Sequence, residues 1–182
     1  GVVQENLLTA PDGSAIFKID GPFGAASQEV FDFETVVLVG AGIGVTPFAS
    51  ILKSIRYKIE LHGQCSIRKA YFFWISRDKY SFEWFSDLLA ALESENLDSF
   101  LEINTYLTGQ LSVDEIKNVM YDNTGRDPTT GLQSPTHYGR PNWDEIFAQL
   151  FEAHMGTTIG VFFCGPRVLS KMLYAQCVKW TE

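Results

Sequence analysis

A glycine-rich segment in the first third of the chain has the composition of an anion-binding turn. The segment Gly40-Ala41-Gly42-Ile43-Gly44-Val45-Thr46-Pro47 lies between a short apolar run and an amphipathic stretch. Such a turn lets backbone N–H groups approach a phosphate at the positive end of the following helix. Its third glycine comes one residue earlier than in the GxGxxG dinucleotide pattern. The segment predicts a pyrophosphate site, with tight packing of a strand against a helix as the alternative.

A second polar pair, Ser76-Arg77, directly follows the apolar run 70–75. Sites selective for NAD place an Asp or Glu at this point to hold a ribose hydroxyl, whereas an arginine with a hydroxyl favours the 2′-phosphate of NADP. The pair therefore predicts selectivity for NADPH. The alternative is a surface ion pair of Arg77 with Asp78 or Asp87, which would contribute little to stability.

Three further positions follow predicted strands or a long loop. Thr108 follows the run 100–107, and Cys164-Gly165-Pro166 follows the run 159–163. Gly165 allows a close backbone approach and Pro166 favours a helix start. We assign Cys164 a positioning role, because no His or Lys nearby in the sequence would activate its thiol as a nucleophile. Arg140 either adds positive charge near the phosphates or ties the loop down, and the sequence leaves both interpretations open.

The composition argues against several other classes of protein. The chain has 182 residues, a formal net charge of −8 and no cluster of basic residues, so a nucleic-acid partner is not expected. Its cysteines and histidines are Cys65, Cys164, Cys177, His62, His137 and His154. Their number and spacing match neither a disulfide framework nor a metal site or catalytic triad, so we expect no metal and a reducing compartment.

The elements that must position these residues alternate between strand and helix. Apolar runs predict strands at 36–39, 70–75, 100–107 and 159–163. Helices are expected from Thr46 as N-cap, from about Ser81, from Asn142 as cap, and from Pro166. This order predicts an α/β fold with a doubly wound, mainly parallel sheet of four strands and flanking helices. Ligands bind beyond the carboxyl ends of such strands, so the turns described above should meet at one edge.

Two segments do not fit this alternation. Residues 15–20 alternate like a strand and stop at Gly21-Pro22, which suggests the end of a preceding unit. Residues 108–138 form a long polar stretch in which Ser112-x-x-Glu115 predicts the start of a short helix. We expect this stretch to contact another domain or a regulatory partner, and a spacer without fixed structure is the alternative.

Six motifs, taken in order, resemble the NADPH-binding domain of superoxide-generating NADPH oxidases, within the ferredoxin-reductase-like or ferric reductase superfamily. They are Asp20-Gly21-Pro22-Phe23-Gly24, the segment 40–48, Ser76-Arg77-Asp78, Phe82-Glu83-Trp84-Phe85, Gly139-Arg140-Pro141-Asn142-Trp143 and Cys164-Gly165-Pro166. The resemblance implies that residues 1–24 are the remnant of an FAD-binding barrel with its linker. It also implies that residues 25–182 form the NADPH-binding domain, whose last edge strand is absent from the chain.

The resemblance also implies how the nucleotide binds. The pyrophosphate would lie over residues 42–46, the 2′-phosphate on Arg77 and Ser76, and the nicotinamide near Cys164 and Pro166, with Arg140 close to the nucleotide.

In the family, hydride passes from NADPH to FAD, and electrons then pass through membrane haems to dioxygen, which gives superoxide. The resemblance therefore implies a place at the cytosolic face of a membrane, with FAD and haem held by other domains of the same polypeptide. A ferric-chelate reductase and a regulatory module without bound nucleotide are the alternatives.

Overall fold

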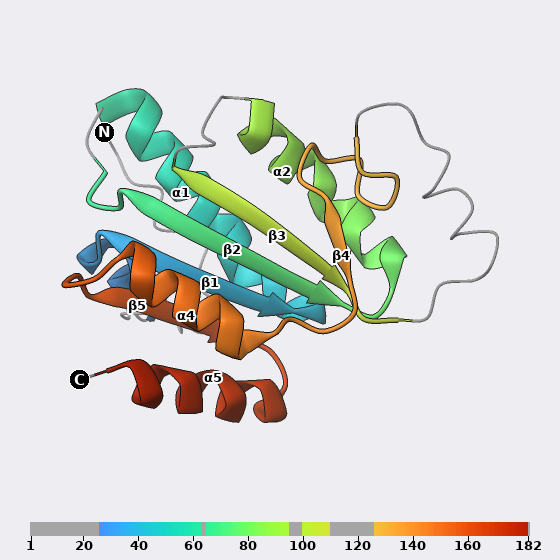
Figure 1. Cartoon of the computed structure of the whole chain (residues 1–182). Helices are drawn as coiled ribbons and strands as arrows, with labels where there is room; N and C mark the ends of the chain where they lie inside the picture. The colour runs from blue at the N-terminus through green and yellow to red at the C-terminus, as the bar shows by residue number, and fades with distance from the viewer. Residues whose placement is uncertain (1–25, 63–64, 95–99, 110–125, 182) are drawn as a thin grey trace, which may run out of the picture.

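The structure is a computed structural model of the chain, and it describes residues 26–62, 65–94, 100–109 and 126–181. Its centre is a five-stranded sheet in the order β4-β3-β2-β1-β5, in which every neighbouring pair is parallel (Figure 1). The strands are β1 (Thr35–Ala41), β2 (Lys69–Ser76), β3 (Leu101–Leu107), β4 (Thr136–Tyr138) and β5 (Ile159–Cys164). The predicted α/β fold with a doubly wound parallel sheet is confirmed.

Helices cover both faces of the sheet. They are α1 (Thr46–His62), α2 (Glu83–Ser94), α4 (Trp143–Ala153) and α5 (Arg167–Trp180), with 3-10 turns η2 (Ala26–Asp32), η3 (Gly42–Val45) and η4 (Lys79–Phe82). Figure 1 shows α1 and α2 on one face, and α4 and α5 on the other. The chain therefore crosses the sheet in both directions, as in other doubly wound folds.

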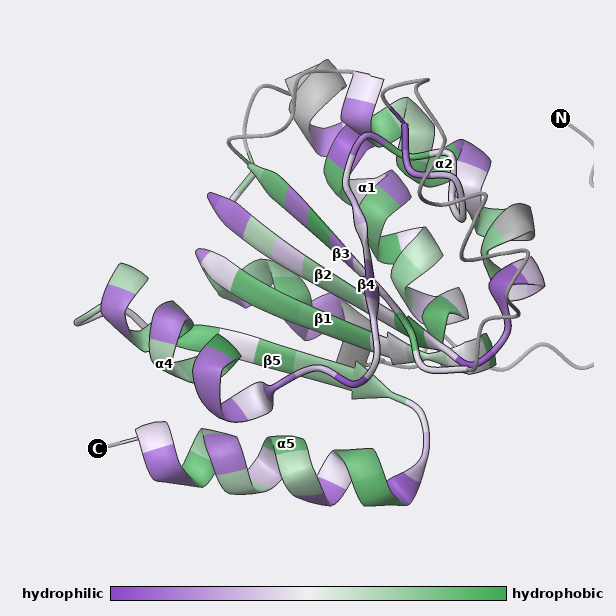
Figure 2. Ribbon diagram, turned by 45° about the vertical axis from the view of Figure 1, so that its right-hand side comes forward, coloured by the Kyte–Doolittle hydropathy of each residue, from purple (hydrophilic) through white to green (hydrophobic). Residues whose placement is uncertain are grey.

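Each face of the sheet packs a separate hydrophobic core. Val36 and Leu38 of β1 point to the α1 and α2 side, whereas Val37 and Val39 point to the side of α4 and α5. All four side chains are fully buried, since alternate residues of a strand face opposite sides. Figure 2 shows the resulting hydrophobic band along β1. This unbroken apolar run explains why the sequence predicts β1 well.

Within the described residues the sheet has five strands, so the prediction of four was wrong. The additional strand, β4, lies inside the segment that was expected to be a loop between residues 108 and 138. It is only three residues long, and of these only Thr136 is buried. No apolar run marks it, and its pairing of Thr136 with Thr105 and of Tyr138 with Leu107 depends on tertiary contacts.

Helix starts also differ in detail from the prediction. Thr46 is already helical, with φ −53° and ψ −44°, because η3 runs directly into α1. An N-cap residue needs extended dihedrals, so Thr46 is not the N-cap, and its hydroxyl donates to the carbonyl of Ile43 at 2.8 Å. Asn142 does precede α4 as predicted, but its side chain makes no capping hydrogen bond.

Some predictions fall outside the described residues. These are the strand at 15–20, the barrel remnant at 1–24 and the helix that Ser112-x-x-Glu115 was expected to open. Within the described part of the long loop, residues 126–138 are folded against the domain, and Leu132 is only 1% exposed. Across the described helices, none combines the length and hydropathy that a membrane crossing requires.

Candidate functional site

The carboxyl ends of the strands bring the predicted site residues to one edge of the sheet. In the register of the sheet, Gly40 lies level with both Trp74 and Cys164. Ser76 likewise pairs with Leu107, which in turn pairs with Tyr138. The turns that follow β1, β2, β3, β4 and β5 therefore share this edge, which we call the carboxyl rim. The chain reverses its direction of winding between β1 and β5, and such switch points are where ligands bind in open parallel sheets.

The turns after β1 and β5 touch each other at this switch point. A Cβ placed on Gly44 would collide with the carbonyl group of Cys164, and one placed on Gly165 would lie 2.8 Å from the Cβ of Ala41. Only glycine permits this approach of two backbones. Two segments about 120 residues apart in the sequence thus form one surface, as a shared site requires.

The first part of the glycine turn is open above the rim. Gly42 has a φ of +57°, and a Cβ built there would meet no atom within 4 Å. The next side chain, Ile43, is 85% exposed. Backbone at these two residues is therefore accessible to a ligand, and a side chain at position 42 would project into the space that such a ligand needs.

The rest of the predicted glycine segment divides into buried and exposed positions. Gly40 is buried, and the Val45 side chain is 0% exposed and packs in the core under α1, so it does not face the rim. Thr46 and Pro47 are exposed at the start of α1. Val45 therefore supports the turn, and any contact it makes with a ligand would come from its backbone.

The hydroxyl of Ser76 is turned into the fold. Its side chain is only 4% exposed. Ser76 Oγ donates to the carbonyl of Asp78 at 2.9 Å and accepts from the amide of Asp78 at 3.2 Å. This pattern is a local side-chain turn. Ser76 thus shapes the turn after β2, and the structure does not present its hydroxyl to solvent.

Arg77, in contrast, is exposed at the rim. Among the described residues, no carboxylate lies within ion-pair distance of its guanidinium. The alternative of a surface pair with Asp78 or Asp87 is therefore wrong. Asp78 instead accepts a hydrogen bond from the amide of Tyr80 at 3.1 Å.

Thr108 ties the end of β3 to the end of β2. Its amide donates to the carbonyl of Ser76 at 2.7 Å, and its hydroxyl donates to the same oxygen at 3.1 Å. The next residue, Gly109, packs so closely that a Cβ there would collide with the carbonyl of Arg77. Thr108 therefore holds the Arg77 turn in place, and its hydroxyl is already engaged.

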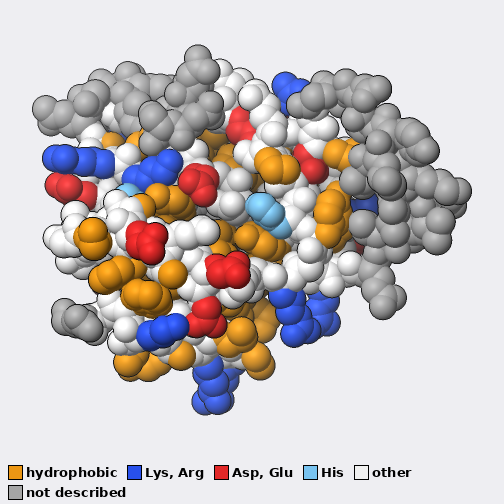
Figure 3. All heavy atoms as spheres, in the orientation of Figure 1, with side chains coloured by type: hydrophobic (Ala, Val, Ile, Leu, Met, Phe, Trp, Pro, Cys, Tyr) orange, Lys and Arg blue, Asp and Glu red, His pale blue; other side chains and the backbone are white. Residues whose placement is uncertain are grey.

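Basic side chains gather at the carboxyl rim although the chain as a whole is acidic. Arg77, Arg140 and Arg167 are all exposed there, and Arg167 is the first residue of α5, after Pro166 at the N-cap. Figure 3 shows basic side chains close together at this edge, with acidic ones spread over the neighbouring face. A rim of this charge favours an anionic ligand.

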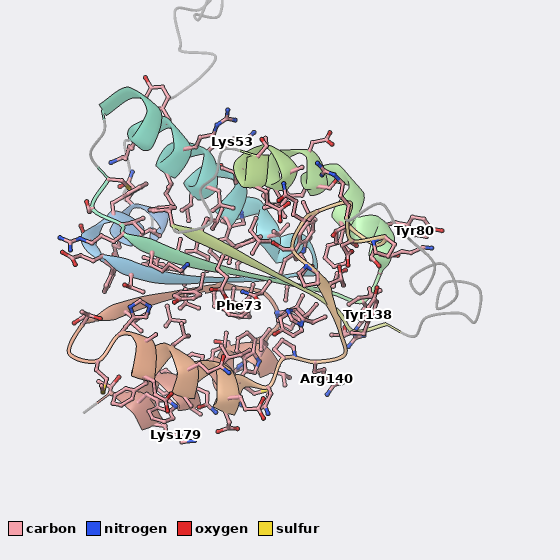
Figure 4. All side chains as sticks on the ribbon, turned by 45° about the horizontal axis from the view of Figure 1, so that its top comes forward. Lys53, Phe73, Tyr80, Tyr138, Arg140 and Lys179 are labelled. Carbon is pink, nitrogen blue, oxygen red and sulfur yellow. The ribbon has the colours of Figure 1, made fainter. Side chains whose placement is uncertain are left out.

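Arg167 and two tyrosines were missed by sequence reasoning. A cation in the first turn opposes the helix dipole, and this local conflict is a sequence signal that could have revealed Arg167. Tyr80, in η4 just after the Arg77 turn, is 61% exposed, and Tyr138, the last residue of β4, is 44% exposed. Figure 4 shows Tyr138 and Arg140 close together at the end of β4, with Tyr80 farther along the same edge.

Among the described residues, no group with a shifted pKa belongs to the glycine turn or to the turns of Arg77 and Cys164. Hydrogen bonds from Lys179 and then Gln176 hold the pKa of Asp144 below its ordinary value. Burial, followed by the charge of Glu102, raises the pKa of Tyr71 and of Tyr106. Cys164 is half-buried at the switch point, and no group of three or more possible metal ligands occurs among the residues described. What the rim offers is backbone, arginines and aromatic rings, which suit binding more than proton transfer.

A cavity of about 430 Å³ lies elsewhere, between α4, α5 and the start of β5. Its lining is mainly apolar and includes Phe147, Leu150, Val161 and Trp180, with no Lys, Arg, Asp or Glu. Ile159, which begins β5, belongs to this lining, whereas the rim lies beyond Cys164 at the other end of that strand. The cavity therefore does not match a phosphorylated ligand.

Residues 33–178 match the family described as the ferric reductase NAD binding domain. The chain belongs to this family. This ferric reductase NAD-binding domain is 55% identical over 184 residues to a superoxide-generating NADPH oxidase heavy chain of Dictyostelium discoideum, covering 100% of this chain and 36% of that protein. It is 44% identical over 170 residues to NADPH oxidase 1 of Mus musculus, covering 91% and 29% of the two chains.

Among solved structures, the domain is similar to a variant of ferredoxin-NADP+ reductase from Plasmodium falciparum in complex with 2′P-AMP. The TM-score is 0.52 at 13% identity, and the match covers 90% of this chain and 54% of that chain. At this identity the likeness shows a shared fold. The predicted resemblance to the nucleotide domain of NADPH oxidases is confirmed, and the domain spans about a third of the length of those curated relatives.

Proposed function

We propose that this domain binds NADPH and presents its nicotinamide for hydride transfer within a membrane NADPH oxidase. The observation that carries the proposal is the carboxyl rim, where an open glycine turn, an exposed arginine and the Cys164 turn occur together. NADPH is an extended anion with a phosphate at one end and the reactive ring at the other, so it needs these features in one continuous surface.

The pyrophosphate would lie over Gly42 and Ile43, close to the N-terminus of α1. Backbone is accessible at these residues, and helix N-termini favour negative charge. Thr46 and Pro47 would border the same group. Arg140 and Arg167 supply further positive charge from the neighbouring turns.

The 2′-phosphate would bind Arg77, whose exposed guanidinium can make paired hydrogen bonds with phosphate oxygens. Ser76 and Thr108 serve this contact indirectly, because they fix the turn that carries Arg77. The solved relative is in complex with 2′P-AMP, a 2′-phosphorylated adenine nucleotide, and this supports NADP as the nucleotide class.

The nicotinamide would lie at the switch point, beside Cys164, Gly165 and Pro166. Hydride transfer depends on the alignment of donor and acceptor more than on acid–base groups. FAD, bound by another domain of the polypeptide, would supply a two-electron acceptor that releases electrons singly. Cys164 and its neighbours would then fix the ring's position, and the close contact of Gly44 with Cys164 keeps that surface in place.

We further propose that electrons continue through membrane haems to dioxygen, with the domain at the cytosolic face of the membrane. The support comes from the relatives, one of which is named as superoxide-generating. The description of the family favours a second candidate, a ferric-chelate reductase, which differs only in the final electron acceptor.

The acceptor decides between these two, and the test uses the complete polypeptide in membranes. With NADPH as donor, we expect cytochrome c reduction that superoxide dismutase abolishes, and little reduction of a ferric chelate under anaerobic conditions. Anaerobic reduction of the chelate at the same rate would instead assign a ferric reductase. Calorimetry that detects no NADPH binding would favour a regulatory module that keeps the fold without the nucleotide.

A further inference from the structure

The strand that leads to Arg140, β4, is short and, within the described residues, has a neighbouring strand on only one side. β4 spans only Thr136–Tyr138 and lies at the edge of the sheet, paired with β3 on one side. Beyond it, the Gly139 amide donates to the Leu107 carbonyl at 2.9 Å. A three-residue edge strand opens easily, so other contacts must hold it in place.

Asp127 supplies one set of these contacts. Its carboxylate accepts hydrogen bonds from the amide and the hydroxyl of Thr136, both at 2.7 Å. It also accepts from the amides of Thr129 and Thr130 at 3.0 and 2.9 Å. The turn at residues 127–132 is thereby joined to the first residue of β4.

Glu93, in the last turn of α2, supplies the other set. Its Oε2 accepts from the Gln133 amide at 2.7 Å, and its Oε1 accepts from the amide and hydroxyl of Ser134 at 3.0 and 2.6 Å. The side chain is only 8% exposed, and no described Lys or Arg pairs with it. A buried carboxylate is costly unless hydrogen bonds satisfy it, and here the segment before β4 donates all three of these bonds.

Residues 134–140 connect the hydrogen bonds of Glu93 to the carboxyl rim. From Ser134 the chain passes through Pro135, whose φ is fixed, and then through β4 to Arg140. At the rise of an extended chain, this is a path of about 20 Å. The Tyr138 hydroxyl lies 3.0 Å from Thr129 Oγ1, so the segment is also closed on itself near its rim end.

We propose that Glu93 is a positioning residue for nucleotide binding, which acts by holding residues 133–134 so that β4 places Arg140 at the rim. The inference rests on the proposed function, because it takes NADPH to be the ligand of the rim. Glu93 itself lies at the far end of α2 and does not touch the nucleotide. Its influence is expected on binding of the phosphates common to NADPH and NADH, since Arg140 lies at the end of β4 and not in the turn of Arg77.

The first test is Glu93→Gln in the complete polypeptide, with calorimetric titration of NADPH and NADH. The amide keeps the size of the side chain but loses the charge and one acceptor, so the segment is held less well. We expect both nucleotides to bind roughly fivefold more weakly. An effect of this size lies within the range of coupling that is usual between residues of one hydrogen-bond network. Ser94→Ala is the matched control, since the Ser94 hydroxyl donates to the Ala91 carbonyl within the same helix turn, at 2.8 Å.

The second test separates positioning from general stability by a double-mutant cycle with Arg140→Ala. If Glu93 acts through Arg140, Glu93→Gln should have no further effect on binding in the Arg140→Ala background. An equal loss in both backgrounds would overturn the proposal, as would unchanged binding by Glu93→Gln alone. Ser134→Ala, which removes only the 2.6 Å bond, should weaken binding in the same direction and serves if Glu93→Gln does not fold.

Hydrogen exchange without nucleotide provides a readout that does not depend on the ligand. Glu93→Gln should speed exchange at the amides of Gln133 and Ser134 and in β4, and leave β1 unchanged. Unchanged exchange there would also overturn the proposal. If the wild-type protein binds no NADPH, the proposed function fails first. If the wild type binds and the variant binds equally well, only the inference about Glu93 fails.

Discussion

Replacing Arg77 with alanine should weaken the binding of NADPH far more than that of NADH. The two nucleotides differ only in the 2′-phosphate, and Arg77 is the exposed cation in the turn where that phosphate is expected. No carboxylate among the described residues pairs with this guanidinium, so the substitution breaks no ion pair within the described fold. Its effect on nucleotide binding should therefore come from the lost contact with ligand.

The size of the effect follows from the exposure of the site. A hydrogen bond to a charged group contributes about 1.5–3 kcal/mol, and solvent screening at an exposed rim favours the lower end of this range. A loss of about 1.5–2 kcal/mol corresponds to a roughly 10- to 30-fold weaker Kd for NADPH. NADH binding should change by less than about twofold, because only diffuse attraction is lost.

Calorimetric titration of both nucleotides, at low and at physiological salt, measures the Kd of NADPH and of NADH for the wild type and for Arg77→Ala. Arg68→Ala is the matched control. Arg68 is an exposed arginine just before β2, at the amino ends of the strands and opposite the carboxyl rim. Its Nη2 lies 3.5 Å from Glu34 Oε1. This control changes the net charge equally and should leave both affinities unchanged. Equal losses for NADPH and NADH in Arg77→Ala, or an equal effect of Arg68→Ala, would refute the assignment of Arg77 to the 2′-phosphate.

Three further predictions test other parts of the rim and the sheet. Gly42→Val should abolish binding of both nucleotides in a folded protein, because the side chain fills the open space above the turn at a φ of +57°; calorimetry of a variant with a native circular dichroism spectrum checks this. Arg167→Ala should raise Tm slightly without nucleotide and weaken nucleotide binding several-fold, because removing a cation from a helix N-terminus stabilises by about 0.3–1 kcal/mol. Glu102→Gln should lower the pKa of Tyr71, for which Glu102 is the second cause of elevation after burial, as measured by tyrosinate absorbance. Because the folded pKa of Tyr71 is raised, its contribution to stability is full below the ordinary value of 10.0 and is lost as pH rises through the folded pKa.

Much of the fold could be predicted because a strand that is buried on both faces needs a continuous run of apolar residues. The strand at 35–41 is buried on both faces, so residues 36–39 at its centre are hydrophobic without interruption, and the helix after it begins within one residue of the expected position. The convergence of Gly42, Arg77 and Cys164 at one edge also follows from sequence, since each lies at the end of a strand of a parallel sheet or directly after one.

What could not be predicted depends on side chains that act across long distances in the sequence. Asp127 accepts hydrogen bonds from the first residue of β4 and Glu93 from the segment before it, and neither residue stands out as an anchor in the sequence. The inward turn of the Ser76 hydroxyl likewise depends on the backbone of Asp78, which sequence types do not reveal. Val45 was assigned to the ligand from its place in the motif, yet the tight turn η3 directs its side chain into the core.

Local rules of stability are broken at the carboxyl rim in ways that a bound anion would reverse. Arg167 opposes the dipole of α5, and the residues that precede α4 and α5 make no side-chain capping bond. Asp144 and Glu145 lie in the first turn of α4 and compensate its N-terminus, whereas the first turn of α5 has no acidic residue and carries Arg167. A phosphorylated nucleotide supplies the missing negative charge, so binding would turn these local costs into favourable contacts. The rim is therefore expected to gain stability from the nucleotide beyond what its contact area alone predicts, and a Tm that rises steeply with NADPH concentration is the corresponding signature.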